Sequence, residues 1–356
     1  MSRADRVAAR LAERELDVLL VTDLVNVRYL TGYTGTNGLA VVGPQTRRFL
    51  TDFRYVEQAA AQVGGDFDRE TVPRDLRLGL ADGWPAGPVR LGFEDQHVSV
   101  RAAAQLRETL PDRVDLVPAG GLVEAERATK EPAELAAIRA AAALTDEIYD
   151  WLAERGIAGR TERELALALE HEMRLRGADD PAFPSIVAAG ANGALPHAVP
   201  RDVPVPAGTL ITLDIGARVD GYCSDCTRTW ATGELPDDLA AVYATVLEAQ
   251  EAGLAAVRPG RTGREVDAVA RELIDAAGHG ERFGHGLGHG VGLDVHEGPR
   301  LAQTSEERLE PGNVVTVEPG IYVPGRGGVR IEDLVVVTDA GHEVLSATTK
   351  AHRVVA

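Results

Sequence analysis

Short apolar runs alternate with polar, glycine-containing stretches along the first third of the chain. Apolar runs bounded by turn residues predict strands, and apolar positions at helical spacing predict helices. The elements expected here are a helix from Val7 to Leu11, strands at 18–21, 38–42, 49–51 and 89–92, and a helix at 55–63. Strands interleaved with helices predict a small α/β domain, which we assign to residues 1–125.

A cluster of proline and glycine at 117–121 interrupts this pattern, and we expect the domain boundary beside it. The second domain is then residues 126–356. It opens with a long helix, because Pro132 suits the first helical position and apolar residues follow it at helical spacing. The length agrees with two domains, since 356 residues exceed what one hydrophobic core usually organises.

The second half contains an internal repeat. Gly-Arg-Thr-x-x-Glu occurs at 159–164 and again at 260–265, and in both copies Thr and Glu form a capping box that starts a helix. One interpretation is a good helix start used twice. The other is a duplicated helix–loop–helix unit, which gives the domain pseudo-twofold symmetry and a site at its centre.

Composition places the chain among soluble globular proteins, with 44% hydrophobic and 26% charged residues. Acidic residues outnumber basic ones by 55 to 37, and the resulting net charge of −18 repels nucleic acids and anionic membranes. The N-terminal segment is charged throughout, and the apolar runs are too short to span a bilayer. We therefore expect a cytoplasmic protein with no nucleic-acid or membrane partner.

Two residue types are scarce. The cysteines are Cys223 and Cys226, which we interpret as structural thiols, because a zinc site needs further ligands and the surrounding segment has a strand pattern. Lys130 and Lys350 are the lysines among the 37 basic residues. A genome's base composition can produce such a skew, so it predicts no function by itself.

Residues 210–230 read as two strands joined by a turn at Val219-Asp220 or Asp220-Gly221. With either turn, Asp214 and Asp225 share one face of the strand pair, opposite each other or on the diagonal. Two facing carboxylates repel, so the pair needs a cation or a shared proton. The alternative is that both carboxylates point to water.

Three histidines, His285, His289 and His296, fall within the glycine-rich stretch 284–299, whose glycines permit close backbone approach. A flexible surface loop is the alternative. Two apolar strands at 314–320 and 329–337 then carry Glu318 and Glu332, and a buried carboxylate must be paired, protonated or metal-bound. For Glu332 the alternative is a local ion pair with Arg330.

Together these segments supply four carboxylates and one imidazole. Such an oxygen-rich set suits two hard divalent cations, whose four positive charges balance the four carboxylates. A water between two such ions is a nucleophile near neutral pH. The carboxylates are Asp214, Asp225, Glu318 and Glu332.

The order of these motifs resembles the pita-bread metallopeptidases, a family that includes aminopeptidase P, prolidase and methionine aminopeptidase. The resemblance covers essentially the whole chain. It implies an α/β (α+β) fold, in which an N-terminal creatinase-like α/β domain precedes a C-terminal, pseudo-symmetric pita-bread metallopeptidase domain. The metal ligands that it implies are Asp214, Asp225, His289, Glu318 and Glu332. The metals are two divalent ions, with Mn²⁺ expected first and Co²⁺, Fe²⁺ or Zn²⁺ as alternatives.

The resemblance also implies roles for the other residues. The catalytic set is His197, His285, His296, Glu318 and Arg330. His197 and His285 line the substrate pocket, and His296 stabilises the oxyanion that forms when the metal-bridging hydroxide attacks the scissile carbonyl. Glu318 shuttles the proton to the leaving nitrogen.

The large N-terminal domain, and Arg330 in place of the glutamine of methionine aminopeptidases, favour the branch that cleaves Xaa-Pro bonds. We expect an Xaa-Pro aminopeptidase of the aminopeptidase P type, acting on peptides with proline in second position and assembled as a homodimer. The alternatives are an Xaa-Pro dipeptidase, or prolidase, and more remotely an inactive binding module with the same fold.

Overall fold

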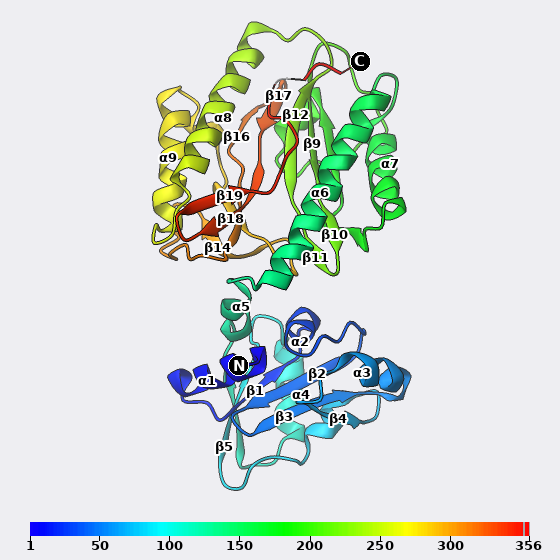
Figure 1. Ribbon diagram of the computed structural model, residues 1–356, viewed down its shortest axis with the longest axis vertical. Coiled ribbons are helices and arrows are strands. Elements are labelled where there is room, and N and C mark those ends of the chain that lie inside the picture. The colour runs from blue at the N-terminus through cyan, green and yellow to red at the C-terminus, as the bar shows by residue number, and fades with distance from the viewer. Residues whose placement is uncertain (352, 356) are drawn as a thin grey trace. The chain divides into compact units, whose positions relative to one another are not determined.

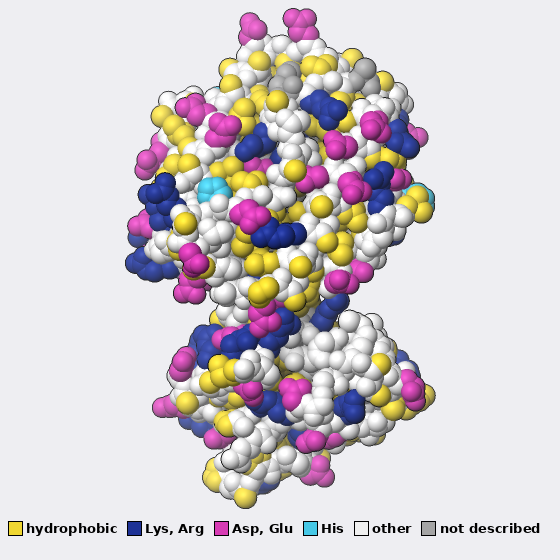
Figure 2. Space-filling model, viewed as in Figure 1, with side chains coloured by type: hydrophobic (Ala, Val, Ile, Leu, Met, Phe, Trp, Pro, Cys, Tyr) yellow, Lys and Arg dark blue, Asp and Glu magenta, His cyan; other side chains and the backbone are white. Residues whose placement is uncertain are grey.

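The computed structural model describes residues 1–351 and 353–355, and the chain divides into two compact units, Met1–Arg127 and Ala128–Ala356 (Figure 1). We call these the N-terminal and the C-terminal unit. Among the described residues, no helix has the length and apolar character needed to cross a membrane. In the view of Figure 2, acidic and basic side chains are interspersed over the surface of each unit.

The N-terminal unit is built on one mixed sheet. Its strands are β1 (Val18–Val21), β2 (Gly38–Gly43), β3 (Thr46–Thr51), β4 (Asp68–Thr71), β5 (Val89–Phe93) and β6 (Val114–Pro118), in the order β4-β3-β2-β1-β5-β6. Its helices are α1 (Arg3–Arg10), α2 (Leu24–Thr31), α3 (Val56–Gln62), α4 (Val100–Thr109) and α5 (Leu122–Arg127). Val18, Leu20 and Leu91 of the central strands pack with Leu106 of α4 in one apolar cluster. The α/β class expected for this part of the chain is confirmed.

The described part of the C-terminal unit contains two helix pairs and four sheets. The helices are α6 (Pro132–Arg155), α7 (Glu162–Leu175), α8 (Asp237–Ala256) and α9 (Gly263–Ala276). The strands are β7 (Asp180–Pro181), β8 (Ile186–Ala189), β9 (Leu210–Ile215), β10 (Ala217–Val219), β11 (Tyr222–Cys223), β12 (Cys226–Ala231), β13 (Gly288–Gly290), β14 (Glu297–Leu301), β15 (Val314–Val317), β16 (Gly320–Val323), β17 (Gly327–Arg330), β18 (Asp333–Thr338) and β19 (Gly341–Val344). Pro132 begins α6 at its first position, as predicted.

The two halves of this unit repeat one arrangement. Thr161 caps α7 and Thr262 caps α9, each through a complete capping box. The residue before each cap also bonds alike, since the carbonyl of Arg160 accepts from Val205 N–H and that of Arg261 accepts from Leu309 N–H. The equivalent strand sets are β8-β9-β12 and β13-β15-β18. The duplicated helix–loop–helix interpretation is therefore the one that the fold supports.

Each half has its own hydrophobic core. Helices α6 and α7 pack against β8, β9 and β12, whereas α8 and α9 pack against β15 and β18. Figure 1 shows the two helix pairs on opposite sides of the strands. The strands between the helix layers are thus the place where side chains from both halves meet.

Candidate active site

The first two acidic residues lie on one hairpin. Strands β10 and β11 pair Val219 with Tyr222, so Asp220-Gly221 forms the two-residue loop, and both loop residues have positive φ, 48° and 78°. The same register pairs Asp214 with Thr227, which places Asp225 on the diagonal from Asp214. Both carboxylates are buried, at 9% and 6% exposure. The alternative in which they point to water is therefore wrong.

Glu332 comes from the other half of the unit. Residues 329–337 do not form the single strand expected from their apolar pattern: they divide into β17 and β18, and Glu332 lies between the two strands. The Glu332 backbone N–H bonds to the carbonyl of Thr227, and Thr227 Oγ1 donates to Glu332 Oε2 at 2.7 Å. These bonds join the two halves at the carboxylate cluster.

Carboxylate oxygens of Asp214, Asp225 and Glu332 all lie within 4.8 Å of one another. Within the part of the chain that the structure describes, Asp214 Oδ1 and Glu332 Oε1 are buried and have no hydrogen-bond partner. Buried polar atoms are rarely left unsatisfied, and three carboxylates repel at this distance. The donor set therefore fits hard divalent cations.

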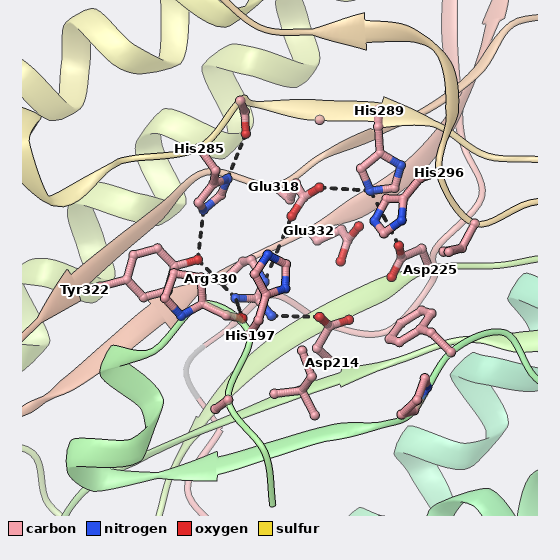
Figure 3. A pocket seen from close by; sticks show the side chains of 18 of the residues that line it. His197, Asp214, Asp225, His285, His289, His296, Glu318, Tyr322, Arg330 and Glu332 are labelled. Atoms are coloured by element: carbon pink, nitrogen blue, oxygen red, sulfur yellow. Dashed lines mark hydrogen bonds and ion pairs between the residues drawn. The ribbon is translucent and has the colours of Figure 1, made fainter. Parts of the chain in front are cut away.

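His289 and Glu318 complete the cluster (Figure 3). His289 Nε2 lies 3.2 Å from Glu318 Oε1 and 3.7 Å from Asp225 Oδ2. Glu318 follows directly after β15, and Thr316 Oγ1 donates to its Oε1 at 3.1 Å. The five residues that the sequence grouped thus lie together in one place.

His289 sits in a short strand rather than in a flexible surface loop. A Cβ atom added at Gly288 would lie 2.0 Å from the carbonyl oxygen of Thr316, and one at Gly290 would lie 2.1 Å from that of Gly298. Only glycine fits at either position. These two glycines let the backbone of β13 approach its neighbours and thereby bring His289 to the acidic residues.

Arg330 is buried beside the cluster. Its Nη2 lies 2.7 Å from Asp214 Oδ2, and its Nη1 donates to the Pro196 carbonyl at 3.2 Å and to Tyr322 Oη at 3.0 Å. The local pairing with Glu332 considered from the sequence is therefore replaced by a pairing with Asp214 across the halves.

Tyr322 was missed by the sequence analysis. It lies on β16, which pairs with β17, and its hydroxyl joins His285 Nε2, 2.9 Å away, to Arg330. The sequence signal that could have pointed to Tyr322 was its position four residues after Glu318, in the strand that begins at Gly320. An aromatic residue in such a strand is usual, so only the fold identifies it as part of the site.

The cluster forms part of the wall of a pocket of about 540 Å³. His197, His285 and His296 also line this pocket, as does Arg300. The rings of His289 and His296 meet edge to face, with 4.4 Å between centroids. The metal-ligand and catalytic residues that the resemblance implied therefore all line one cavity, which has the size of a small-molecule site.

The protonation of the cluster follows from burial and crowding. Burial, followed by the neighbouring acidic charges, raises the pKa of Asp225 and of Glu332 well above the usual range. Burial would also raise the pKa of Glu318, but the hydrogen bond and charge of His289 lower it to about 2. In the absence of cations, Asp225 and Glu332 therefore hold their protons to higher pH than ordinary carboxyl groups do.

Comparisons with known proteins agree with this geometry. The model of metallopeptidase family M24 matches residues 136–339, and that of the creatinase/prolidase N-terminal domain matches residues 3–129. The Xaa-Pro dipeptidase of Pyrococcus furiosus is 42% identical over 98% of this chain and 98% of its own length.

Two solved structures share the fold. An Xaa-Pro dipeptidase from Bacillus anthracis has a TM-score of 0.94 and 38% identity, covering 99% of each chain. An X-Pro aminopeptidase from Thermotoga maritima has a TM-score of 0.88 and 33% identity, covering 99% of this chain and 100% of its own. The chain therefore belongs to metallopeptidase family M24, carries a creatinase/prolidase N-terminal domain, and is a metallo-exopeptidase.

Proposed function

We propose that the protein is an Xaa-Pro dipeptidase with a dinuclear metal centre. The observation that carries the proposal is the buried cluster of Asp214, Asp225 and Glu332 in the wall of the pocket, whose carboxylate oxygens lie within 4.8 Å of one another. Among the described residues, Asp214 Oδ1 and Glu332 Oε1 have no hydrogen-bond partner. Relatives named Xaa-Pro dipeptidases, 38% and 42% identical, support the substrate class.

Five residues would hold the two divalent cations. They are Asp214, Asp225, His289, Glu318 and Glu332. When bound, the cations supply an activated water and polarise the scissile carbonyl. Mn²⁺ is the metal that we propose, because carboxylate-rich sites with one imidazole suit it better than structural zinc.

Two residues would act on the substrate from the pocket wall. Glu318 lies in the pocket wall beside His289, and from this position its carboxylate would carry a proton to the leaving proline nitrogen. His296 lies beside His289 in the same pocket, and burial lowers its pKa, so its neutral ring offers one N–H donor to the developing oxyanion.

Three residues would shape the binding site. The Arg330 side chain fixes Asp214 Oδ2 and leaves Oδ1 for a cation. His285 and Tyr322 hold each other through a hydrogen bond at the pocket wall, and burial lowers the pKa of His285. A neutral His285 gives this part of the pocket the low charge that a proline ring prefers.

The preference for dipeptides differs from the expectation drawn from the sequence, which placed aminopeptidase P first. Relatives named Xaa-Pro dipeptidases favour the alternative. The pocket agrees with them, because Arg300 lines it and, among the described residues, its guanidinium has no ion pair or hydrogen-bond partner. The C-terminal carboxylate of the proline in a dipeptide is the partner that such a cation selects.

An Xaa-Pro aminopeptidase is the second candidate, because the Thermotoga maritima structure with that name shares the fold at 33% identity. In that case the pocket must admit chain beyond the proline. The inactive binding module has no support, since all four carboxylates and His289 lie in place.

Metal removal and return tests the proposal. Chelation should abolish hydrolysis of Gly-Pro, and Mn²⁺ should restore it, whereas Gly-Ala should remain a poor substrate throughout. Full activity after complete chelation would overturn the dinuclear centre. Equal rates on Gly-Pro and Gly-Ala would overturn the proline preference.

A further inference from the structure

Both lysines of the chain, Lys130 and Lys350, are paired next to the site. Lys130 Nζ lies 3.0 Å from Glu297 Oε2, and Lys350 Nζ lies 2.8 Å from Asp333 Oδ2. Each of these carboxylates directly follows a residue of the site, since Glu297 comes after His296 and Asp333 after Glu332. The remaining 35 basic residues are arginines, so every lysine of the chain lies in this setting.

The Lys130 pair is the more enclosed of the two. The side chains of Lys130 and Glu297 are 1% and 6% exposed, whereas that of Lys350 is 24% exposed. Lys130 Nζ also donates to the carbonyl of Ala128 at 3.3 Å. An enclosed ammonium with acceptors at this spacing suits lysine, whose compact charge needs less room than the planar guanidinium of arginine.

Lys130 is held in place through its own backbone. Its N–H donates to the carbonyl of Gly312 at 2.9 Å, and Asn313 Nδ2 donates to the carbonyl of Ala128 at 3.0 Å. These bonds tie the segment before α6 to the turn that leads into β15. The ammonium is therefore a fixed point, to which Glu297 is attached.

Glu297 in turn closes the loop that carries His296. Its Oε1 accepts from the Asp294 N–H at 3.0 Å, so one carboxylate bonds both to the loop and to Lys130. A Cβ atom at Gly292 would lie 2.6 Å from that carboxylate, which shows how closely the loop wraps around it. His296 lines the pocket, whereas neither Glu297 nor Lys130 does.

We infer that Lys130 is a positioning residue, which acts through Glu297 to hold the 291–297 turn so that the His296 ring faces the carboxylate cluster. This inference rests on the role proposed above for His296. His296 is the last residue of this loop and Glu297 is the first residue of β14, so fixing the Glu297 side chain fixes the end of the loop from which the His296 ring extends. Loss of the anchor leaves the cluster intact but lets His296 leave its productive position.

The test is a double-mutant cycle on the Mn²⁺-loaded enzyme with Lys130→Met, Glu297→Gln and the double variant. The double variant matters most, because removing both buried charges avoids leaving one of them unpaired. The matched control is the surface pair Arg139–Glu343, with side chains 41% and 51% exposed, changed to Met and Gln in the same way.

Three quantities are measured for each variant: kcat and KM on Gly-Pro, the metal content, and the hydrogen exchange of the amides of residues 291–298. We expect kcat to fall about 10- to 100-fold, since small displacements of a catalytic group have effects of this size. KM and metal content should stay near the wild-type values, and exchange should become faster in this turn. The effects of the two single changes should not add, because both break one interaction.

A double variant that keeps both the wild-type kcat and the wild-type exchange rates would overturn the inference. A kcat loss matched by the Arg139–Glu343 control would also overturn it. A wild-type enzyme inactive on Gly-Pro would refute the proposed function instead, and the exchange measurement would still test whether Lys130 holds the turn.

Discussion

Arg330 and Asp214 form a buried ion pair across the two halves of the C-terminal unit, with 2.7 Å between Nη2 and Oδ2. The guanidinium occupies one oxygen of the carboxylate, and the other oxygen has no partner among the described residues. The same arginine bonds to Pro196, next to His197, and to Tyr322. One side chain thus orients a proposed metal ligand and the pocket wall together.

The Arg330→Met change should weaken metal binding and activity about 10- to 100-fold, because a group that orients a metal ligand typically has effects of this size. Lysine should not restore the loss, since it cannot hold Asp214 and Tyr322 with a planar fork. Mn²⁺ titration and kcat/KM on Gly-Pro measure the effect. Arg326→Met is the matched control, because Arg326 lies in the same hairpin but pairs with Asp238 on the surface. Equal losses in both variants would contradict the account.

The Asp225→Asn change should not lower the stability of the metal-free protein but should reduce the stabilisation that Mn²⁺ gives. In metal-free protein burial and the neighbouring acidic charges raise the pKa of Asp225 and so disfavour its ionised form, and replacing it by a neutral amide should therefore not lower stability. With Mn²⁺, the rise in melting temperature seen for the wild type should shrink, and kcat/KM should fall about 10³-fold or more. Thermal unfolding with and without Mn²⁺ checks the first part. A variant with the full metal-induced rise would contradict the role of Asp225 as a ligand.

Metal binding should release protons and become tighter as pH rises. Burial and the neighbouring acidic charges raise the pKa of Asp225 and of Glu332, so these groups carry protons that the cations must displace. The stability of the metal-free protein should change in the opposite direction and fall as pH rises, because a raised carboxyl pKa gives stability that is lost as pH rises through that pKa. Calorimetric titration in buffers of different ionisation enthalpy counts the protons. Binding with no proton release at any pH at which the protein stays folded would contradict the raised pKa values.

The Gly288→Ala change should displace His289 and destabilise the C-terminal unit by about 2 kcal/mol or more, because its Cβ would lie 2.0 Å from a backbone oxygen. Gly284→Ala is the control in the same stretch, since a Cβ there has open space around it. Urea unfolding and metal content compare the two variants. Equal stability of both would show that the backbone approach at β13 is less close than described.

The Arg300→Met change should raise KM for Gly-Pro about tenfold while changing kcat less, since it removes a carboxylate partner from the pocket wall. Gly-Pro amide is the matched substrate, because it lacks the charge that Arg300 would bind. Its KM should be the same for wild type and variant. A KM for Gly-Pro unchanged by the substitution would exclude this role of Arg300.

Much of the site was predictable because its residues break local rules. Carboxylates in apolar strands and histidines among glycines are unfavourable unless something compensates them, and Asp214, Glu332 and His289 were recognised on that ground. Tyr322 and the Lys130–Glu297 pair break no local rule. Their importance depends on contacts between segments far apart in the chain, which spacing alone does not reveal.

The secondary structure was likewise predictable only where it follows from the local sequence pattern. Strand β1 was predictable, since all four of its residues are apolar and buried. Strand β4 (Asp-Arg-Glu-Thr) was not, because it is an edge strand held by backbone bonds to β3 and has no apolar pattern. The break in 329–337 was also unpredictable, since Glu332 lies inside an apolar run and its bonds to Thr227 come from a segment about 100 residues earlier in the chain.

The most direct test of the central claim compares Gly-Pro with Gly-Pro-Ala, using the Mn²⁺-loaded enzyme. The account predicts that kcat/KM for the dipeptide exceeds that for the tripeptide at least about tenfold, because only in the dipeptide is the carboxylate of proline free and charged. Equal or faster hydrolysis of the tripeptide would contradict dipeptidase activity and identify the enzyme as an Xaa-Pro aminopeptidase.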